Sequence, residues 1–133
     1  MLKDAPGFSG FSVNDMARAK EFYGTTLGLD VVDRPLGLPG ADVPTGLEIH
    51  LATGTSVIVY PKPDHIPATF TILSFMVDDI DRAVDELTAR GVRFERYETS
   101  PRTDARGIHR TPEVHPTAWF RDPAGNILSI IER

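Results

Sequence analysis

The amino-acid sequence predicts an α+β fold built from two copies of one β-α-β-β-β unit. Three observations support this fold class: an internal repeat, an aspartate at the start of a helix in each copy, and a strand hairpin near the end of each copy. In each copy the helix is expected to cover one face of the strands and to leave the other face open. The two units are expected to pair, so that their open faces form a concave cup.

The repeat joins the segment FSVNDMARAKEF, which begins at Phe11, to FMVDDIDRAVDE, which begins at Phe75, 64 residues later. Five of the twelve aligned positions are identical, among them Asp15 and Asp79. Such self-similarity marks a repeated supersecondary unit. Because an aspartate side chain accepts backbone N–H bonds at a helix start, both residues are predicted to be N-caps.

In the first copy a strand leads to Asp15, and a helix follows it. The apolar stripe of this helix is Met16, Ala19, Phe22 and Tyr23, and Gly28 ends the region. The segment LDVVDR is predicted as the next strand, and GLEIHLA and TSVIVY as a hairpin across TGT.

The second copy repeats this order. TFTILSFMV is predicted as a strand, the helix runs from Ile80 to a left-handed exit at Gly91, and GVRFERYE is predicted as the next strand. TAWFRD and NILSIIE form the closing hairpin across PAG, after the long polar connection RTDARGIHRTPEVHP. A linker around Pro61–Pro67 divides this single domain into modules of about 1–62 and 66–133.

Composition narrows the function classes. The chain of 133 residues has no cysteine, which excludes thiolate nucleophiles, disulfides and cysteine-ligated zinc. A net charge of −5 disfavours a nucleic-acid partner, which selects a basic surface. No apolar run is long enough to span a bilayer, and MLKDAPGF lacks the core of a secretory signal. We therefore expect a cytoplasmic protein without nucleic-acid or membrane partners.

Three segments in this order, VNDMARAKEFYGTTLGLDVV, VDDIDRAVDELTARGVRFE and FRDPAGNILSIIE, resemble the vicinal oxygen chelate superfamily. This superfamily includes glyoxalase I, bleomycin-resistance proteins and extradiol dioxygenases. The resemblance covers essentially the whole chain and implies the cup of two βαβββ modules and a homodimer. It does not imply one activity, because the superfamily places isomerases, lyases, dioxygenases and drug binders on one scaffold.

The resemblance also implies where a metal ligand set is expected. Metal-dependent members carry a histidine at the start of each half and a glutamate in each closing strand. Counted onto this chain, these positions are Phe8, Val59, Ile72 and Ser129, with an uncertainty of one residue at Val59. Apolar side chains and a neutral hydroxyl are poor ligands for a divalent metal. The sequence therefore predicts a protein with no metal ligands at these positions and no cofactor.

Strand alternation directs further side chains to the cup. Glu48 and His50 share a face and form either an acid/base pair or part of a solvated strand. Trp119 either stacks on a flat ligand or packs in the core. The predicted ligand contacts are Phe8, Ser12, Glu48, His50, Val59, Ile72, Ser74, Trp119 and Ser129.

The leading functional prediction is the binding of a small, partly apolar organic molecule in the cup. The alternative is a metal-independent isomerase or lyase in which His50 and Glu48 move a proton next to a carbonyl group. A third, weaker alternative is a metal-dependent glyoxalase or dioxygenase with ligands relocated to Glu48, His50 and either His109 or His115. The sequence leaves open whether a reaction is catalysed and whether His109 and His115 close over the cup. It assigns His65, in the linker, a structural hydrogen bond.

Overall fold

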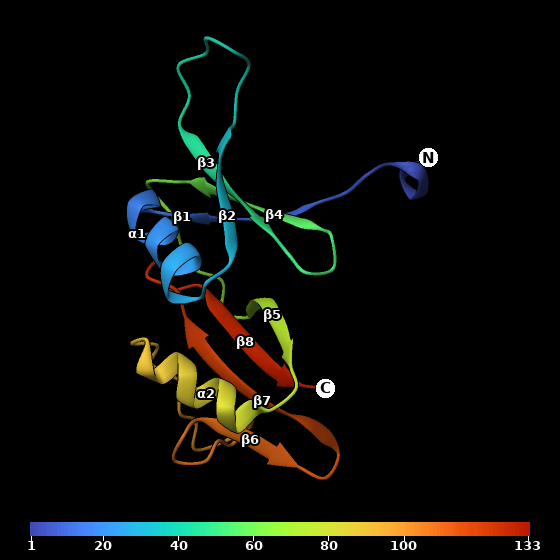
Figure 1. Ribbon diagram of the computed structural model, residues 1–133, viewed down its shortest axis with the longest axis vertical. Helices are drawn as coiled ribbons and strands as arrows, with labels where there is room; N and C mark the ends of the chain where they lie inside the picture. The colour runs from blue at the N-terminus through green and yellow to red at the C-terminus, as the bar shows by residue number, and fades with distance from the viewer. The chain divides into compact units, whose positions relative to one another are not determined.

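A computed structural model describes the whole chain, Met1–Arg133, as two compact units, Met1–His65 and Ile66–Arg133 (Figure 1). Each unit contains a four-stranded sheet, in the order β1-β4-β3-β2 in the first and β5-β8-β7-β6 in the second. The first and last strands of each unit pair in parallel, and the other neighbours are antiparallel. The two sheets therefore repeat one topology, which confirms the predicted fold class.

The first unit follows the predicted order. After a short 3-10 helix (Leu2–Asp4), its elements are β1 (Ser9–Val13), α1 (Met16–Lys20) with a π-helical continuation (Glu21–Thr26), β2 (Asp30–Pro35), β3 (Thr45–His50) and β4 (Ser56–Pro61). The carboxylate of Asp15 accepts a hydrogen bond of 3.1 Å from the backbone N–H of Arg18, so Asp15 is the predicted N-cap. The α-helical part has only five residues, because the six residues that follow it form a π-helix.

The core of the first unit lies between this helical segment and one face of the sheet. Val13, Ile49 and Val59 are fully buried on that face, and Tyr23 is fully buried beneath the helical segment. The rings of Phe11 and Tyr23 lie 5.6 Å apart between their centroids. Because side chains alternate along a strand, the neighbours of these core residues point to the open face.

The second unit consists of β5 (Thr71–Val77), α2 (Ile80–Ala89), β6 (Ile108–Thr111), β7 (Val114–Arg121) and β8 (Ile127–Glu132). Asp79 accepts a hydrogen bond of 3.0 Å from the N–H of Arg82, as the repeat predicts. A second carboxylate oxygen, from Glu132, accepts from the N–H of Ile80 at 2.9 Å. Two of the backbone donors that a helix start leaves unpaired are therefore satisfied by side chains.

The strand predicted for GVRFERYE is wrong in extent. This segment makes a single bridge, between Phe94 and Phe120, and the edge position beside β7 is then taken by β6. The segment nevertheless alternates as a strand does, since Val92 and Phe94 are buried and Arg93 between them is exposed. The bridge ends after Glu95, whose N–H bonds to the carbonyl of Trp119, and the chain leaves the sheet before it returns as β6. The edge strand is thus assembled from two separate segments.

α2 lies against β7 and β8 and buries Ile80 and Val84 (Figure 1). None of the helices in the chain combines the length and the apolar character needed to cross a membrane.

Candidate functional site

The open face of the first sheet carries a row of charged side chains across β2 and β3. Asp30 lies opposite His50 and Val32 lies opposite Glu48 in the antiparallel register, so these side chains share one face. His50 Nδ1 lies 3.0 Å from an oxygen of Asp30, and its Nε2 lies 3.6 Å from an oxygen of Glu48. Arg34 completes the row with an Nη1–Oε2 distance of 3.4 Å to Glu48.

These neighbours change the protonation of His50. The hydrogen bond to Asp30 is the largest influence and raises the pKa of His50 above its usual value, and Glu48 adds to this effect. A raised pKa means that the imidazole is positively charged over a wider pH range. The row Asp30–His50–Glu48–Arg34 therefore alternates in sign when His50 is protonated. A pocket of about 300 Å³ adjoins this row and is lined by Phe8, Arg34, Glu48 and Ser56, among others.

Ser12 and His65 meet on the same unit. The hydroxyl of Ser12 lies 2.6 Å from Nδ1 of His65, and Nε2 of His65 is buried without a hydrogen-bond partner. The predicted structural hydrogen bond of His65 is therefore confirmed. Phe8 precedes β1 and leaves 74% of its surface exposed.

The open face of the second sheet carries hydroxyl groups beside aromatic rings. Ser74, Ser129 and Trp119 lie side by side in the register of β5, β8 and β7. The hydroxyl groups of Ser74 and Ser129 are 2.7 Å apart, and Ser129 is only 2% exposed. The lone hydroxyl in the closing strand is thus a hydrogen-bonded residue at the centre of the open face.

Aromatic side chains gather around Trp119. The ring of Tyr97 lies edge-on to the indole at a centroid distance of 5.9 Å, and the imidazole of His109 lies at 6.3 Å. A pocket of about 480 Å³ opens beside this cluster, with walls from Trp119, Tyr97, Phe70, Arg121 and Ile127. Phe70 is 68% exposed, which leaves a large apolar surface at the pocket. Burial and the charge of Glu95 raise the pKa of the Tyr97 hydroxyl, so it remains a neutral hydrogen-bond donor.

Two predicted ligand contacts lie elsewhere than expected. Val59 is fully buried with Ile49 on the face of the sheet that the helix covers. The position counted from the family's ligand pattern is therefore one residue away from the open face. Its neighbours Ile58 and Tyr60 take the open face instead. Ile72 is half-buried and sits where the pairing of β5 with β8 shifts register.

The histidines predicted to lie in a loop lie in strands. His109 belongs to β6 and its Nδ1 lies 2.7 Å from the carbonyl oxygen of Arg102, while His115 belongs to β7 and is exposed. No group of three or more His, Asp or Glu side chains is arranged to hold a metal ion. Glu48 and His50 belong to the first unit and His109 and His115 to the second, so the relocated ligand set stays a prediction.

Sequence reasoning missed Asp30 and Arg34, which hold His50 and Glu48, and Tyr97 and Phe70, which line the pocket. Alternation along LDVVDR, combined with the pairing of β2 and β3, would have placed Asp30 and Arg34 on the same face as His50 and Glu48. Tyr97 lies in an irregular segment, for which no periodic pattern exists.

Comparisons with known proteins agree with this geometry. The sequence model of the Glyoxalase/Bleomycin resistance protein/Dioxygenase superfamily matches residues 8–130. TnmS3, an antibiotic-binding protein from Streptomyces sp. CB03234, is 26% identical, with 97% of each chain covered and a TM-score of 0.67. No curated protein sequence matches the chain significantly.

Two further solved structures share the fold at lower identity. A superfamily member from Sphaerobacter thermophilus is 24% identical, with 96% of this chain and 98% of that chain covered and a TM-score of 0.69. The fosfomycin resistance protein FosX from Listeria monocytogenes is 11% identical, with 96% and 90% covered and a TM-score of 0.70. With its duplicated four-stranded sheets and a match over residues 8–130, this chain belongs to the Glyoxalase/Bleomycin resistance protein/Dioxygenase superfamily.

Proposed function

We propose that this protein binds a small, partly apolar organic molecule against Trp119 on the open face of the second unit. The observation that carries the proposal is the pocket of about 480 Å³ beside Trp119 and Tyr97. Its volume falls within the range of small-molecule sites, which are mostly apolar with a few polar groups. A ligand that fills it covers Phe70, whose ring is 68% exposed.

The lining favours a ligand with a flat ring system. Trp119 and Tyr97 stand edge to face at 5.9 Å, so one indole surface contacts Tyr97 and the ligand stacks on the remaining aromatic surface. Arg121 supplies a polar edge, and its guanidinium is held by Glu95 at 2.9 Å and by the carbonyl of Gly125. This pairing leaves the pocket close to neutral, which suits an uncharged ring better than a strong anion.

The comparison with TnmS3 supports a binding function. That protein is an antibiotic-binding protein and is 26% identical over 97% of the chain. The predicted contacts Ser12, Ser74 and Ser129 do not line this pocket, and their role as hydrogen-bonding groups for a ligand remains a separate proposal. We further propose that the protein acts as a homodimer in the cytoplasm. Sedimentation of the purified protein tests the dimer, and fractionation of the native cell tests the location.

A second candidate is the metal-independent isomerase or lyase that uses His50 and Glu48. The observation in its favour is the hydrogen bond that Nδ1–H of His50 donates to the carboxylate of Asp30. It orients the ring and leaves Nε2 as the nitrogen that accepts a proton. Against it, Nε2 lies 3.6 Å from Glu48, and both carboxylates favour the protonated imidazole. A protonated imidazole cannot accept a proton, so this upward shift of the His50 pKa counts against the enzyme, and we favour the binding protein.

Trp119 provides its own assay, because it is the only tryptophan of the chain. We expect flat aromatic antibiotics, screened as a panel, to include compounds that quench its fluorescence saturably. Calorimetry should give an affinity at least about tenfold weaker for Trp119→Ala, since a buried aromatic contact is often a dominant one. Phe8→Ala removes an exposed aromatic ring from the first unit and serves as the control.

Unchanged affinity in Trp119→Ala, with folding shown intact by circular dichroism, would place the ligand elsewhere. Loss of an α-proton from a carbonyl compound in deuterated water, abolished by His50→Ala, would instead favour the enzyme.

A further inference from the structure

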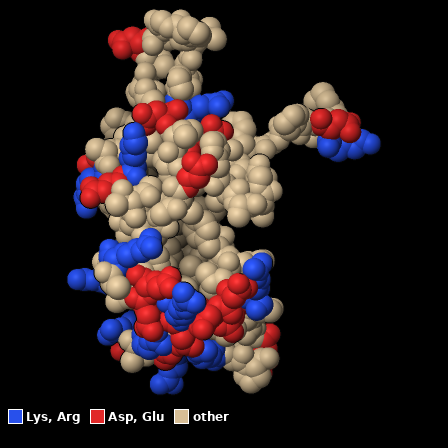
Figure 2. Space-filling view, in the orientation of Figure 1, with Lys and Arg blue, Asp and Glu red and all other residues tan.

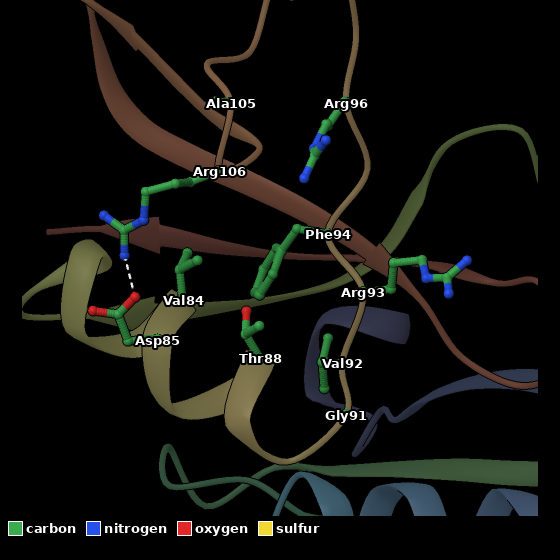
Figure 3. Close-up of a pocket in the computed structure, with 10 residues that line it drawn as sticks. All are labelled: Val84, Asp85, Thr88, Gly91, Val92, Arg93, Phe94, Arg96, Ala105 and Arg106. Carbon is green, nitrogen blue, oxygen red and sulfur yellow. Dashed lines mark hydrogen bonds and ion pairs between the residues drawn. The ribbon is translucent and has the colours of Figure 1, made fainter.

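A second pocket lies on the helix side of the second unit, between α2 and the segment that leaves it (Figure 3). It has a volume of about 390 Å³. Its lining comes from three residues of α2, from Gly91–Phe94 with Arg96, and from Ala105 and Arg106. None of these residues takes part in the open-face pocket beside Trp119.

The floor of this helix-side pocket is apolar. Val84, Val92 and Phe94 are between 3% and 8% exposed, so they are part of the core and form a firm surface. Thr88 points its hydroxyl upward beside the ring of Phe94 (Figure 3). A ligand that enters the pocket therefore meets an apolar base with one neutral hydrogen-bonding group.

The rim is positively charged. Three arginines and one aspartate line the pocket, in a chain whose net charge is −5. Arg106 closes one side through its ion pairs with Asp85 and Asp81, so its guanidinium is already neutralised. Figure 2 shows acidic and basic side chains intermixed on the surface of this unit.

Arg96 differs from the other cations of the pocket. It extends into the hollow above Phe94, whereas Arg93 extends away from it (Figure 3). No hydrogen bond or ion pair within the protein engages the guanidinium of Arg96. An unpaired guanidinium over an apolar floor is suited to a carboxylate or phosphate carried on an apolar body, because its planar fork binds such oxygens bidentately.

We propose that the helix-side pocket binds a small organic anion, with Arg96 on the charged group, Thr88 as a second donor and Phe94 and Val92 under the apolar body. The charged group is a carboxylate or a phosphate monoester. This site is separate from the open face, and its ligand differs from the uncharged ring proposed there. The two proposals therefore stand or fall independently.

Titration of the uniformly ¹⁵N-labelled full chain with phenyl phosphate, and separately with benzoate, tests this site by NMR. We expect one of these anions to shift the amide signals of Thr88 and Gly91–Phe94 saturably. Phenol, which has the same ring without the charge, is expected to leave them unshifted. Arg96→Gln should weaken the binding roughly tenfold, in line with the loss of a charge-assisted hydrogen bond.

Arg93→Gln is the matched control, because it also removes one positive charge. The side chain of Arg93 lies three residues before Arg96 and points out of the pocket. This substitution should change the affinity less than twofold, and Trp119→Phe should leave it unchanged. If Arg93→Gln and Arg96→Gln weakened the binding of the anion equally, the binding would be explained by general charge attraction, and the proposed role of Arg96 would be refuted. Binding of phenol as tight as that of the anions, or no saturable shift with either anion, would also overturn it.

Discussion

The start of α2 offers a sharp test of how this fold is stabilised, because two carboxylates bind its first backbone N–H groups. Asp79 accepts from Arg82 N–H at 3.0 Å and Glu132 accepts from Ile80 N–H at 2.9 Å. Replacing Asp79 by alanine removes one cap bond and one negative charge at the positive end of the helix dipole. A lost cap bond costs about 0.5–2 kcal/mol, and the charge adds about 0.3–1 kcal/mol at low salt.

We therefore expect Asp79→Ala to lower the free energy of unfolding by about 1.5 kcal/mol. With an m-value of about 2 kcal/mol per molar urea, the unfolding midpoint falls by roughly 0.75 M. Asp79→Asn separates the two contributions, because asparagine caps a helix as well as aspartate does but carries no charge. It should lose only about 0.3–1 kcal/mol, and raised salt should reduce that loss.

The assay is urea unfolding followed by far-ultraviolet circular dichroism, with the m-value checked for constancy. Asp78→Ala is the control, since Asp78 is the neighbouring aspartate and pairs with Arg133 rather than with the helix. An Asp79→Ala midpoint equal to that of the control would show that the cap does not stabilise the unit. An Asp79→Asn midpoint equal to that of Asp79→Ala would assign the whole effect to charge.

Four further predictions concern other parts of the molecule. Asp30 raises the pKa of His50, so the stability that this pair contributes should be fully present below about pH 6.5 and lost as the pH rises through the raised pKa; Asp30→Asn should flatten this pH dependence of the urea midpoint. Ser129→Ala should cost about 1 kcal/mol in urea unfolding, because it removes the 2.7 Å bond to Ser74, and a variant as stable as the parent would contradict that bond. Gly107→Ala should cost about 1–2 kcal/mol or more, since Gly107 has a φ of +86° and a new Cβ would approach a backbone oxygen to 2.8 Å; a neutral substitution would disprove the turn. Chelator should leave the melting temperature unchanged, because no three His, Asp or Glu side chains gather as a metal site; a loss reversed by one equivalent of zinc would refute this.

Periodic patterns allowed most of the fold to be predicted from the sequence. The repeat located both capping aspartates, and alternation along GLEIHLA separated the buried Leu47 and Ile49 from Glu48 and His50 on the opposite face. These inferences succeed because burial of one strand face is a local property of the sequence. Each depends only on neighbouring residues.

The remaining features depend on contacts distant in the sequence. GVRFERYE has the alternation of a strand, but whether it pairs over its full length is decided by β6, which reaches the same edge of β7 from the following segment. The resemblance placed a ligand position at Val59 with an uncertainty of one residue, and the structure has Val59 on the buried face while Ile58 and Tyr60 take the other. The aromatic pocket escaped prediction since Tyr97 lies in irregular chain.

The divided edge strand has an evolutionary consequence. Since the sheet is held on either side of the excursion, by the bridge at Phe94 and by β6, the chain between them can change in length or sequence without disturbing the pairing of β7. That excursion begins with Arg96, which extends into the helix-side pocket, and Tyr97, which forms a wall of the open-face pocket. A single insertion or deletion there would therefore alter the walls of both pockets together.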